Sequence, residues 1–282
     1  MTREFKNTFF KAFCWFAVSA CFGMLIFLFG IIFLNGIPAI NLDFITSRSF
    51  NFGAEGGILY QIVGSVLIVI VAAILSFPLA IGTAIFKSEY LKSRKWKKLS
   101  DVLIFGINGI PSVVFGIFGL ILFVNILGFG ISWFVGSIIL SVMMLPTITL
   151  TTFQSINSIP VLYRESSLAL GLNKWQTITK VLLPQSFSGA ITGLFIALAR
   201  AIGETAPIMF IATAFSGVDL PSGIREPVST LPTHILALAQ QATNTDALQN
   251  AWGASFVLIL LVMLFSTTAL VIRKRKLSHI QL

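Results

Sequence analysis

Long apolar segments, separated by short polar ones, constrain the fold of this chain more than any other feature of its sequence. A helix needs about 20 mainly apolar residues to cross the hydrocarbon core of a bilayer. The segments that reach this length are Phe13–Leu34, Ile58–Phe86, Val102–Val124, Phe129–Thr149, Gly189–Thr213 and Trp252–Ile272. The sequence therefore predicts an all-α integral membrane protein with six transmembrane helices.

The composition excludes several classes of protein. Hydrophobic residues make up 56% of the chain and charged residues only 10%, which is typical of an integral membrane protein. The polar segments are too short to form a separate catalytic domain. The sequence lacks both the G-x-x-x-x-G-K-S/T and the G-x-G-x-x-G phosphate-binding patterns, and His234 and His279 are isolated from each other. We therefore expect no catalytic residue, bound cofactor or metal site in this chain.

The distribution of Lys and Arg predicts the orientation of the chain. Only Arg48 and Arg225 fall on one side of the predicted spans, whereas the opposite side carries a large basic excess. Cytoplasmic segments usually hold this excess, so both termini and the segment between the fourth and fifth spans are predicted to be cytoplasmic. We divide the chain into an N-terminus over 1–12, a transmembrane domain over 13–272 and a basic tail over 273–282.

The polar segment at about 152–188 has the local signals of two short helices. Pro160 suits the start of a helix, and Gly171 suits a left-handed C-cap. Asn173 and Gln176 have the spacing of a capping box that opens a second helix. Pro184 either closes this helix or opens the next segment. The exposed apolar residues near the bend are expected to be Leu168, Leu170, Leu172 and Trp175. They fit either an amphipathic loop on the membrane surface or a docking surface for another protein.

The same segment resembles the cytoplasmic "EAA" loop of ABC importer permeases. The resemblance rests on Glu165-Ser166-Ser167, Gly171 and Val181-Leu182-Leu183-Pro184, with serine in place of the usual alanines. It implies that a short helix docks into a separate ATPase, which carries the ATP and Mg. The residues that it assigns to this coupling loop are Glu165, Ser166, Ser167, Leu168, Ala169, Leu170, Gly171 and Pro184.

Two opposite charges, Arg200 and Glu204, fall near the middle of the predicted fifth span. A central Arg costs on the order of 3 kcal/mol in a membrane helix, so it needs a partner or a polar cavity. The two residues are four apart and therefore share one helix face. That face continues through small residues, which either let another helix approach closely or leave room for a pathway. These small residues are Ala197, Gly193 and Gly189.

The charged pair supports two interpretations. It is either an intrahelical ion pair that stabilises the bundle, or a cation on the pathway of an anion, with Glu204 orienting or neutralising Arg200. A planar guanidinium can donate two parallel hydrogen bonds to a tetrahedral oxyanion.

A narrower resemblance adds to the second interpretation. The runs Gly109–Gly116, Tyr163–Thr177 and Ala199–Pro207 resemble permeases of the phosphate-specific ABC importer, and the similarity extends from about Gly56 to the sixth span. The Glu-Thr-Ala-Pro ending of the last run resembles the PstA type rather than the PstC type. Members of this family often have an arginine and a glutamate just before the coupling loop, whereas Thr149–Gln154 has neither.

The resemblance implies a location in the bacterial cytoplasmic (inner) membrane and a set of partners. These are a second, PstC-like permease, a PstB-like ATPase dimer and an extracytoplasmic, PstS-like phosphate-binding protein. The alternatives are a permease for another oxyanion such as sulfate, molybdate or phosphonate, an ATP-independent carrier or channel, and a structural membrane scaffold.

Other features give weaker expectations. The segments Asn35–Gly57 and Ala214–Ala251 are either contact sites for a solute-binding protein or simple connectors, and 232–242 is expected to form a short helix along the outer surface. Cys14 and Cys21 are too far apart on one helix to pair, and we interpret them as packing residues. Prolines within the predicted spans mark expected breaks or bends, and these are Pro78, Pro111, Pro146 and Pro207.

Overall fold

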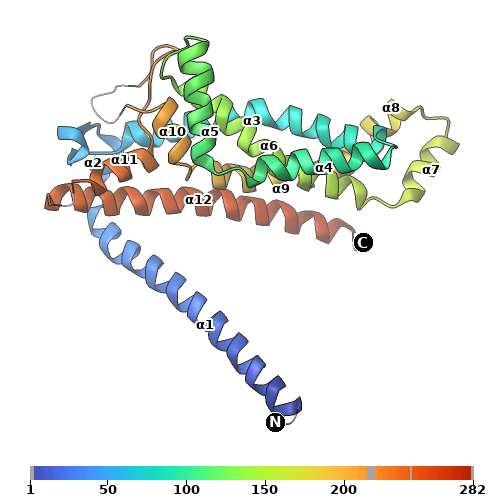
Figure 1. The fold of residues 1–282 in the computed structure, drawn as a ribbon, viewed down its shortest axis with the longest axis horizontal. Coiled ribbons are helices and arrows are strands. Elements are labelled where there is room, and N and C mark those ends of the chain that lie inside the picture. Colours follow the sequence, from blue (N-terminus) through green and yellow to red (C-terminus); the bar gives the residue numbers. More distant parts are fainter. Residues whose placement is uncertain (1–2, 215–219, 242, 281–282) are drawn as a thin grey trace.

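The computed structural model describes residues 3–214, 220–241 and 243–280, and the structure is mainly helical (Figure 1). The long helices are α1 (Arg3–Gly36), α3 (Leu59–Ile85), α6 (Trp133–Asn157), α9 (Leu183–Ala201) and α12 (Thr245–Ile280). The shorter ones are α2 (Leu42–Thr46), α4 (Arg94–Gly109), α5 (Ser112–Gly119), α7 (Val161–Ala169), α8 (Lys174–Thr177), α10 (Ala206–Ile211) and α11 (Leu231–Ala239).

Short elements join these helices. The 3₁₀-helical turns are η1 (Ile37–Ala39) and η2 (Asn51–Gly53), and the π-helical turns are η3 (Phe86–Tyr90), η4 (Leu120–Ile126) and η5 (Ile178–Leu182). Strands β1 (Ser49–Phe50) and β2 (Glu55–Gly56) form a small antiparallel hairpin, in which Ser49 pairs with Gly56.

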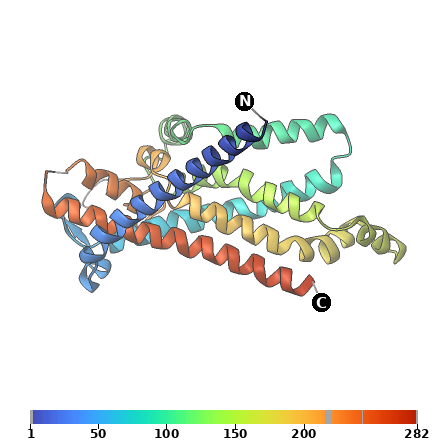
Figure 2. The same cartoon turned by 90° about the horizontal axis from the view of Figure 1, so that it is seen from below.

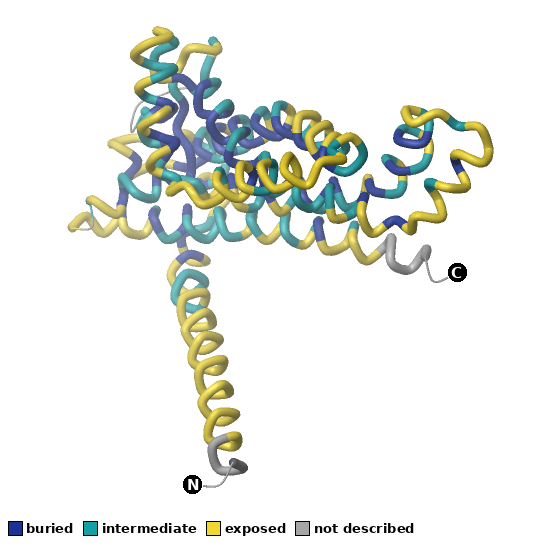
Figure 3. Tube along the Cα trace, turned by 45° about the vertical axis from the view of Figure 1, so that its right-hand side comes forward, coloured by how far each residue is buried: buried dark blue, intermediate teal, exposed yellow. Residues whose placement is uncertain are grey.

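Helices α3, α6, α9 and α12 run side by side, and α6 lies at the centre of the bundle (Figures 1 and 2). Ser132 caps α6, because its side chain accepts a hydrogen bond from the backbone N–H of Val135. Ile139, Leu140 and Ile148 of α6 are almost fully buried in the main hydrophobic core. Figure 3 shows this buried centre, with exposed residues concentrated on the outer faces and along α1.

Among the described residues, five helices are long and apolar enough to cross a membrane, and a bent helix pair brings the number to six. The prediction of six spans is therefore confirmed in number only if the bent pair counts as one span. The predicted third span, Val102–Val124, is wrong as a single continuous helix, because α4 and α5 meet at a 90° bend. Pro111 disfavours helical geometry at the preceding residue, and Ile110 is extended, with φ −72° and ψ 130°.

The predicted fifth span is also interrupted. Helix α9 ends at Ala201, and α10 begins at Ala206 with Pro207 in its first turn. The proline has no backbone N–H to continue the α9 hydrogen-bond ladder. Pro78 and Pro146, in contrast, lie inside α3 and α6.

Glycines bring α6 and α9 into close contact. A Cβ atom on Gly193 would lie 2.9 Å from the Thr151 Cβ, and one on Gly189 would lie 2.4 Å from the Ser155 Cβ. Of the two expectations for this small-residue face, close helix approach is confirmed. No room for a pathway remains on this part of α9, because α6 fills it.

Helix α1 leaves the bundle, and among the described residues its contacts are with α12 and η1, near its C-terminal end (Figure 1). There, the rings of Phe33 and Phe256 meet edge to face, with their centroids 4.9 Å apart. Cys14 and Cys21 are both exposed, so their interpretation as packing residues within this chain is wrong. The reason is that their part of α1 has no neighbouring helix among the residues that the structure describes.

The expected short helix at 232–242 is present as α11 (Leu231–Ala239), which packs against α3 and α12. Leu231 and Leu238 are fully buried. His234 is also buried, and burial lowers its pKa to about 4, so the imidazole is neutral at pH 7. Its Nδ1 lies 3.4 Å from the Gln61 amide nitrogen of α3.

We predict that Gly193→Ala destabilises the bundle by roughly 1–3 kcal/mol, because the added methyl group forces α6 and α9 apart. The measurement is the free energy of unfolding of the purified chain in a mild detergent. Gly82→Ala in α3 is the matched control, since no atom lies within 4 Å of the position of its added Cβ. Equal stability of the two variants would contradict the close-packing argument.

Candidate functional site

The predicted helix–turn–helix at 152–188 is confirmed in detail. Helix α7 follows Pro160 and ends before Gly171, whose φ of +79° is left-handed. The N–H groups of Gly171 and Leu172 donate to the carbonyls of Leu168 and Ser167, which is the hydrogen-bond pattern of a Schellman C-cap. A glycine is therefore favoured at position 171, because the C-cap requires a left-handed backbone conformation there.

The predicted capping box is also present. The Asn173 side chain accepts from the Gln176 N–H at 2.8 Å, and the Gln176 side chain accepts from the Asn173 N–H at 2.9 Å. Of the two expectations for Pro184, the second is confirmed, because this residue lies in the first turn of α9. The turn η5 joins α8 to α9, so Lys174–Ala201 is one helical rod of 28 residues.

The predicted docking residues form an exposed surface on α7 and α8, beyond the end of the bundle (Figure 1). The exposed fractions are 62% for Leu168, 81% for Leu170 and 65% for Trp175. Glu165 is exposed, and it has no hydrogen bond or ion pair within the described part of the chain. Leu172 is half-buried, so its exposure is less than expected. A carboxylate amid exposed apolar side chains is suited to a protein partner.

The remaining residues assigned to the coupling loop divide between surface and interior. Ser166 and Ala169 are exposed, whereas Ser167 is buried. The Ser167 hydroxyl donates to the Tyr163 carbonyl at 2.6 Å, so this residue supports α7 from inside.

Sequence reasoning missed the anchor of this loop, which is η3 at the end of α3. The Glu89 carboxylate accepts hydrogen bonds from Arg164 Nε at 3.2 Å and Nη2 at 3.0 Å. Arg164 also donates to the backbone carbonyls of Ile156 and Ile159. One guanidinium therefore joins the end of α6, the start of α7 and η3.

The same π-helical turn holds α8. Lys174 Nζ donates to the Glu89 carbonyl at 2.6 Å and lies 4.0 Å from the centre of the Tyr90 ring. Lys87 pairs with Asp101 of α4 and lies 4.3 Å from the centre of the Phe153 ring of α6. Only the fold brings these residues together. In the sequence, the available signal is the polar run Lys87-Ser88-Glu89-Tyr90, which directly follows a long apolar segment.

Arg200 and Glu204 are paired as predicted, with 3.4 Å between Arg200 Nε and Glu204 Oε1. The sequence predicts them near the middle of the fifth span, and the structure interrupts the helix at this point. Arg200 is in the last turn of α9, and Glu204 is in the interruption before α10. Arg200 Nη1 also donates to Asn108 Oδ1 at 3.1 Å, a contact with α4 that the sequence did not reveal.

The pair lies partly open at the surface of this chain. The Arg200 side chain is 48% exposed and that of Glu204 is 16% exposed. The partly open pocket beside them has a volume of only about 10 Å³, which is enough for about one water molecule. An anion would therefore have to approach Arg200 from outside this chain's own bundle.

The helical rod links the two candidate regions. It begins at Lys174, whose side chain is anchored on η3, and its last turn carries Arg200. A helix of this length spans about 40 Å. The exposed loop and the charged pair are thus at opposite ends of one helical rod.

Comparison with known proteins gives the class and then the family. Chains in solved structures of ABC importers have a similar fold, and because their sequence identities to this chain are below 20%, they show the fold alone. A bacterial transporter that imports the acidic polysaccharide alginate matches with a TM-score of 0.64 and 18% identity, over 95% of this chain and 98% of the other. The methionine transporter MetNI matches with a TM-score of 0.61 and 16% identity, over 76% and 94%. The fold is that of a type I ABC importer permease.

Residues 76–276 match the family described as "Binding-protein-dependent transport system inner membrane component", and this chain belongs to that family. The probable ABC transporter permease protein YqgI of Bacillus subtilis is 34% identical over 258 residues, covering 87% of both chains. The phosphate transport system permease protein PstA of Xylella fastidiosa is 32% identical over 239 residues, covering 83% of this chain and 81% of the relative. The chain is therefore a multi-pass membrane permease subunit of an ABC importer.

We predict that Glu89→Gln loosens the loop, because it removes the charge that holds Arg164 while preserving side-chain shape. The pair is largely shielded from solvent, and its loss should cost roughly 1–2 kcal/mol. Amide hydrogen exchange of residues 161–177, followed by mass spectrometry, should become faster. Glu165→Gln is the control, because Glu165 has no partner among the described residues. Unchanged exchange in Glu89→Gln would show that the ion pair does not anchor the loop.

Proposed function

We propose that this chain is the PstA-type permease of an ATP-driven phosphate importer, in which it lines the phosphate pathway and couples that pathway to a separate ATPase. The observation that carries the proposal is the half-exposed Arg200, held by Glu204 and Asn108 at the end of a helical rod that starts in the exposed loop. The family supports the role of permease. The PstA relatives support phosphate as the substrate.

Arg200 has the chemistry that an oxyanion pathway needs. Its guanidinium is held by a carboxylate on one side and an amide oxygen on another, which leaves part of its donor edge open. An arriving phosphate would compete with Glu204 for the same donors. This competition keeps binding weak enough for release, as transport requires. The same chemistry suits sulfate, molybdate and phosphonate, so the substrate needs its own test.

The partners follow from the incomplete site and the exposed loop. The small cavity beside Arg200 leaves one side of the pathway to a second, PstC-like permease. The surface containing Glu165, Leu168 and Leu170 would dock on a PstB-like ATPase dimer, which would hold the ATP and Mg. A PstS-like binding protein would deliver phosphate at the opposite face. In this chain we assign no catalytic residue and no cofactor.

The proposed motion uses the contacts already described. Closure of the ATPase dimer would move α7, and the Arg164–Glu89 pair and the Lys174–Glu89 hydrogen bond would carry this movement to η3 and α8. The rod would then move Arg200 relative to Asn108, changing the side from which the anion reaches the guanidinium. The Lys and Arg distribution supports a cytoplasmic location for the loop and both termini, in the bacterial inner membrane.

We predict that Arg200→Lys lowers the initial rate of phosphate uptake by about tenfold or more, because lysine keeps the charge but loses the planar pair of donors. The measurement uses proteoliposomes that contain all subunits, ATP and labelled phosphate. Arg273→Lys in the exposed end of α12 is the matched control and should be neutral.

Three results would contradict parts of the proposal. Normal uptake by Arg200→Lys would reduce the Arg200–Glu204 pair to a structural role. Failure of unlabelled phosphate to compete, with competition by sulfate or molybdate, would exclude phosphate as the substrate. Uptake that persists without the ATPase would favour an ATP-independent carrier.

A further inference from the structure

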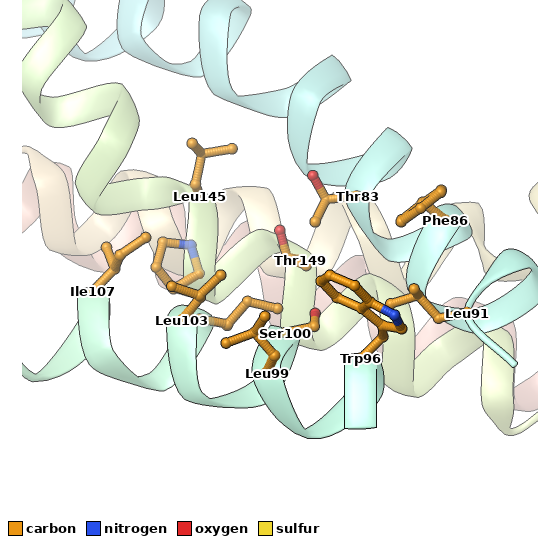
Figure 4. Close-up of a pocket in the computed structure, with 12 residues that line it drawn as sticks. Thr83, Phe86, Leu91, Trp96, Leu99, Ser100, Leu103, Ile107, Leu145 and Thr149 are labelled. Carbon is orange, nitrogen blue, oxygen red and sulfur yellow. The ribbon is translucent and has the colours of Figure 1, made fainter. Parts of the chain in front are cut away.

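An apolar pocket of about 360 Å³ lies between α4, the end of α3 and the middle of α6 (Figure 4). Its volume is within the range of small-molecule binding sites. The pocket exists because α4 packs loosely, and Ile104 is its one buried residue among those described. The side chains that define the apolar wall are Phe86, Leu91, Trp96, Leu99, Leu103 and Leu145.

Helix α4 is amphipathic, and its apolar face points into this pocket. Trp96, Leu99 and Leu103 are spaced three and four residues apart, so they form one stripe along the helix. Trp96 is at the N-terminal end of the stripe (Figure 4). A tryptophan with an apolar ring and a polar N–H is typical of the boundary between lipid and water.

Five cations lie within four residues of Trp96 in the sequence, before and in the first turns of α4, and they are Lys92, Arg94, Lys95, Lys97 and Lys98. All five are exposed, and none forms an ion pair with another residue in the described ranges. The nearby carboxylate of Asp101 is already paired with Lys87. The N-terminal end of α4 therefore combines uncompensated positive charge with unfilled apolar volume.

We propose that this pocket binds an acyl chain of an anionic phospholipid from the inner leaflet, with the lipid phosphate held by the basic residues that flank Trp96. A topology signal alone requires the cations but no pocket, and an apolar interface with another protein requires the pocket but no cations. An anionic lipid satisfies both, because it has a charged head and an apolar chain. Basic residues beside a membrane surface attract such lipids.

The bound lipid would contact the anchor of the coupling loop. Phe86 is a pocket residue and also the first residue of η3. Its ring stacks on Tyr90, with their centroids 6.1 Å apart, and Tyr90 in turn holds the ammonium group of Lys174. Occupancy of the pocket therefore supports the same turn that positions α7 and α8.

The test measures quenching of Trp96 fluorescence by phospholipids with brominated acyl chains, in the purified full chain in neutral detergent. The signal from Trp96 is the difference between the unmodified chain and Trp96→Phe. Brominated phosphatidylglycerol should quench this signal at a mole fraction at least about fivefold lower than brominated phosphatidylcholine does, as expected from one or more cations near the headgroup.

Two variants distinguish binding of the lipid headgroup from binding of its acyl chain. Lys95→Gln with Lys98→Gln should abolish the preference for phosphatidylglycerol, whereas Arg273→Gln with Lys274→Gln, which removes the same charge at the end of α12, should retain it. Leu103→Trp, combined with Trp96→Phe to keep the tryptophan number constant, should fill the pocket. Retention of bound phosphatidylglycerol after purification, measured by mass spectrometry, should then fall.

Four outcomes would overturn the proposal. Equal quenching by the two lipids would show that the cations do not select the headgroup. An equal loss of the phosphatidylglycerol preference in the α12 control would show that the cations act only by non-specific attraction. Relief of quenching by soluble glycerol phosphate would show that the site takes a free anion. Loss of Trp96 quenching when a second permease copurifies would show that the pocket is an interface between permeases.

Discussion

A bilayer interior offers no hydrogen-bond partners to the backbone, so a break in a membrane helix must be buried in protein or line a wet cavity. The described part of the chain has such breaks at Ile110–Pro111 and between α9 and α10. They lie close together, because α5 packs on α10 where Gly116 meets Pro207. Arg200 spans them by bonding Asn108 before one break and Glu204 within the other. The Arg200 side chain therefore links the two interrupted helices through side-chain hydrogen bonds.

Well-packed elements connect the exposed loop on α7 and α8 to Arg200. The rod from Lys174 to Ala201 is packed along α6 through Gly189 and Gly193, so its path is tightly defined. Its start is held on η3, which also holds α7 through Arg164 and Glu89. A displacement of the exposed loop can therefore reach Arg200 through few, well-packed elements. Coupling through such a route requires two arrangements of those elements.

Much of this structure could be predicted from the sequence, because its main signals are local. Apolar length identified the long apolar segments but not the breaks in the third and fifth. The left-handed Gly171 and the Asn173–Gln176 capping box were readable from residue type and spacing. The contacts of Glu89 with Arg164 and of Arg200 with Asn108 were not, because their partners are 75 and 92 residues apart in the chain. The sequence also could not show which prolines interrupt a helix. Breaks occur beside Pro111 and Pro207, whereas Pro78 and Pro146 lie within continuous helices.

The most direct test of loop-to-Arg200 coupling is the labelling of Asn108→Cys by a membrane-impermeant thiol reagent, in a complete importer in which Cys14 and Cys21 are serine. The reactive side should switch from the cytoplasmic face without nucleotide to the outer face when ATP is trapped. Glu165→Lys, which reverses the charge on the exposed loop, should abolish the switch, whereas Glu55→Lys should preserve it. A labelling pattern that does not depend on nucleotide, or a switch that persists in Glu165→Lys, would contradict the account.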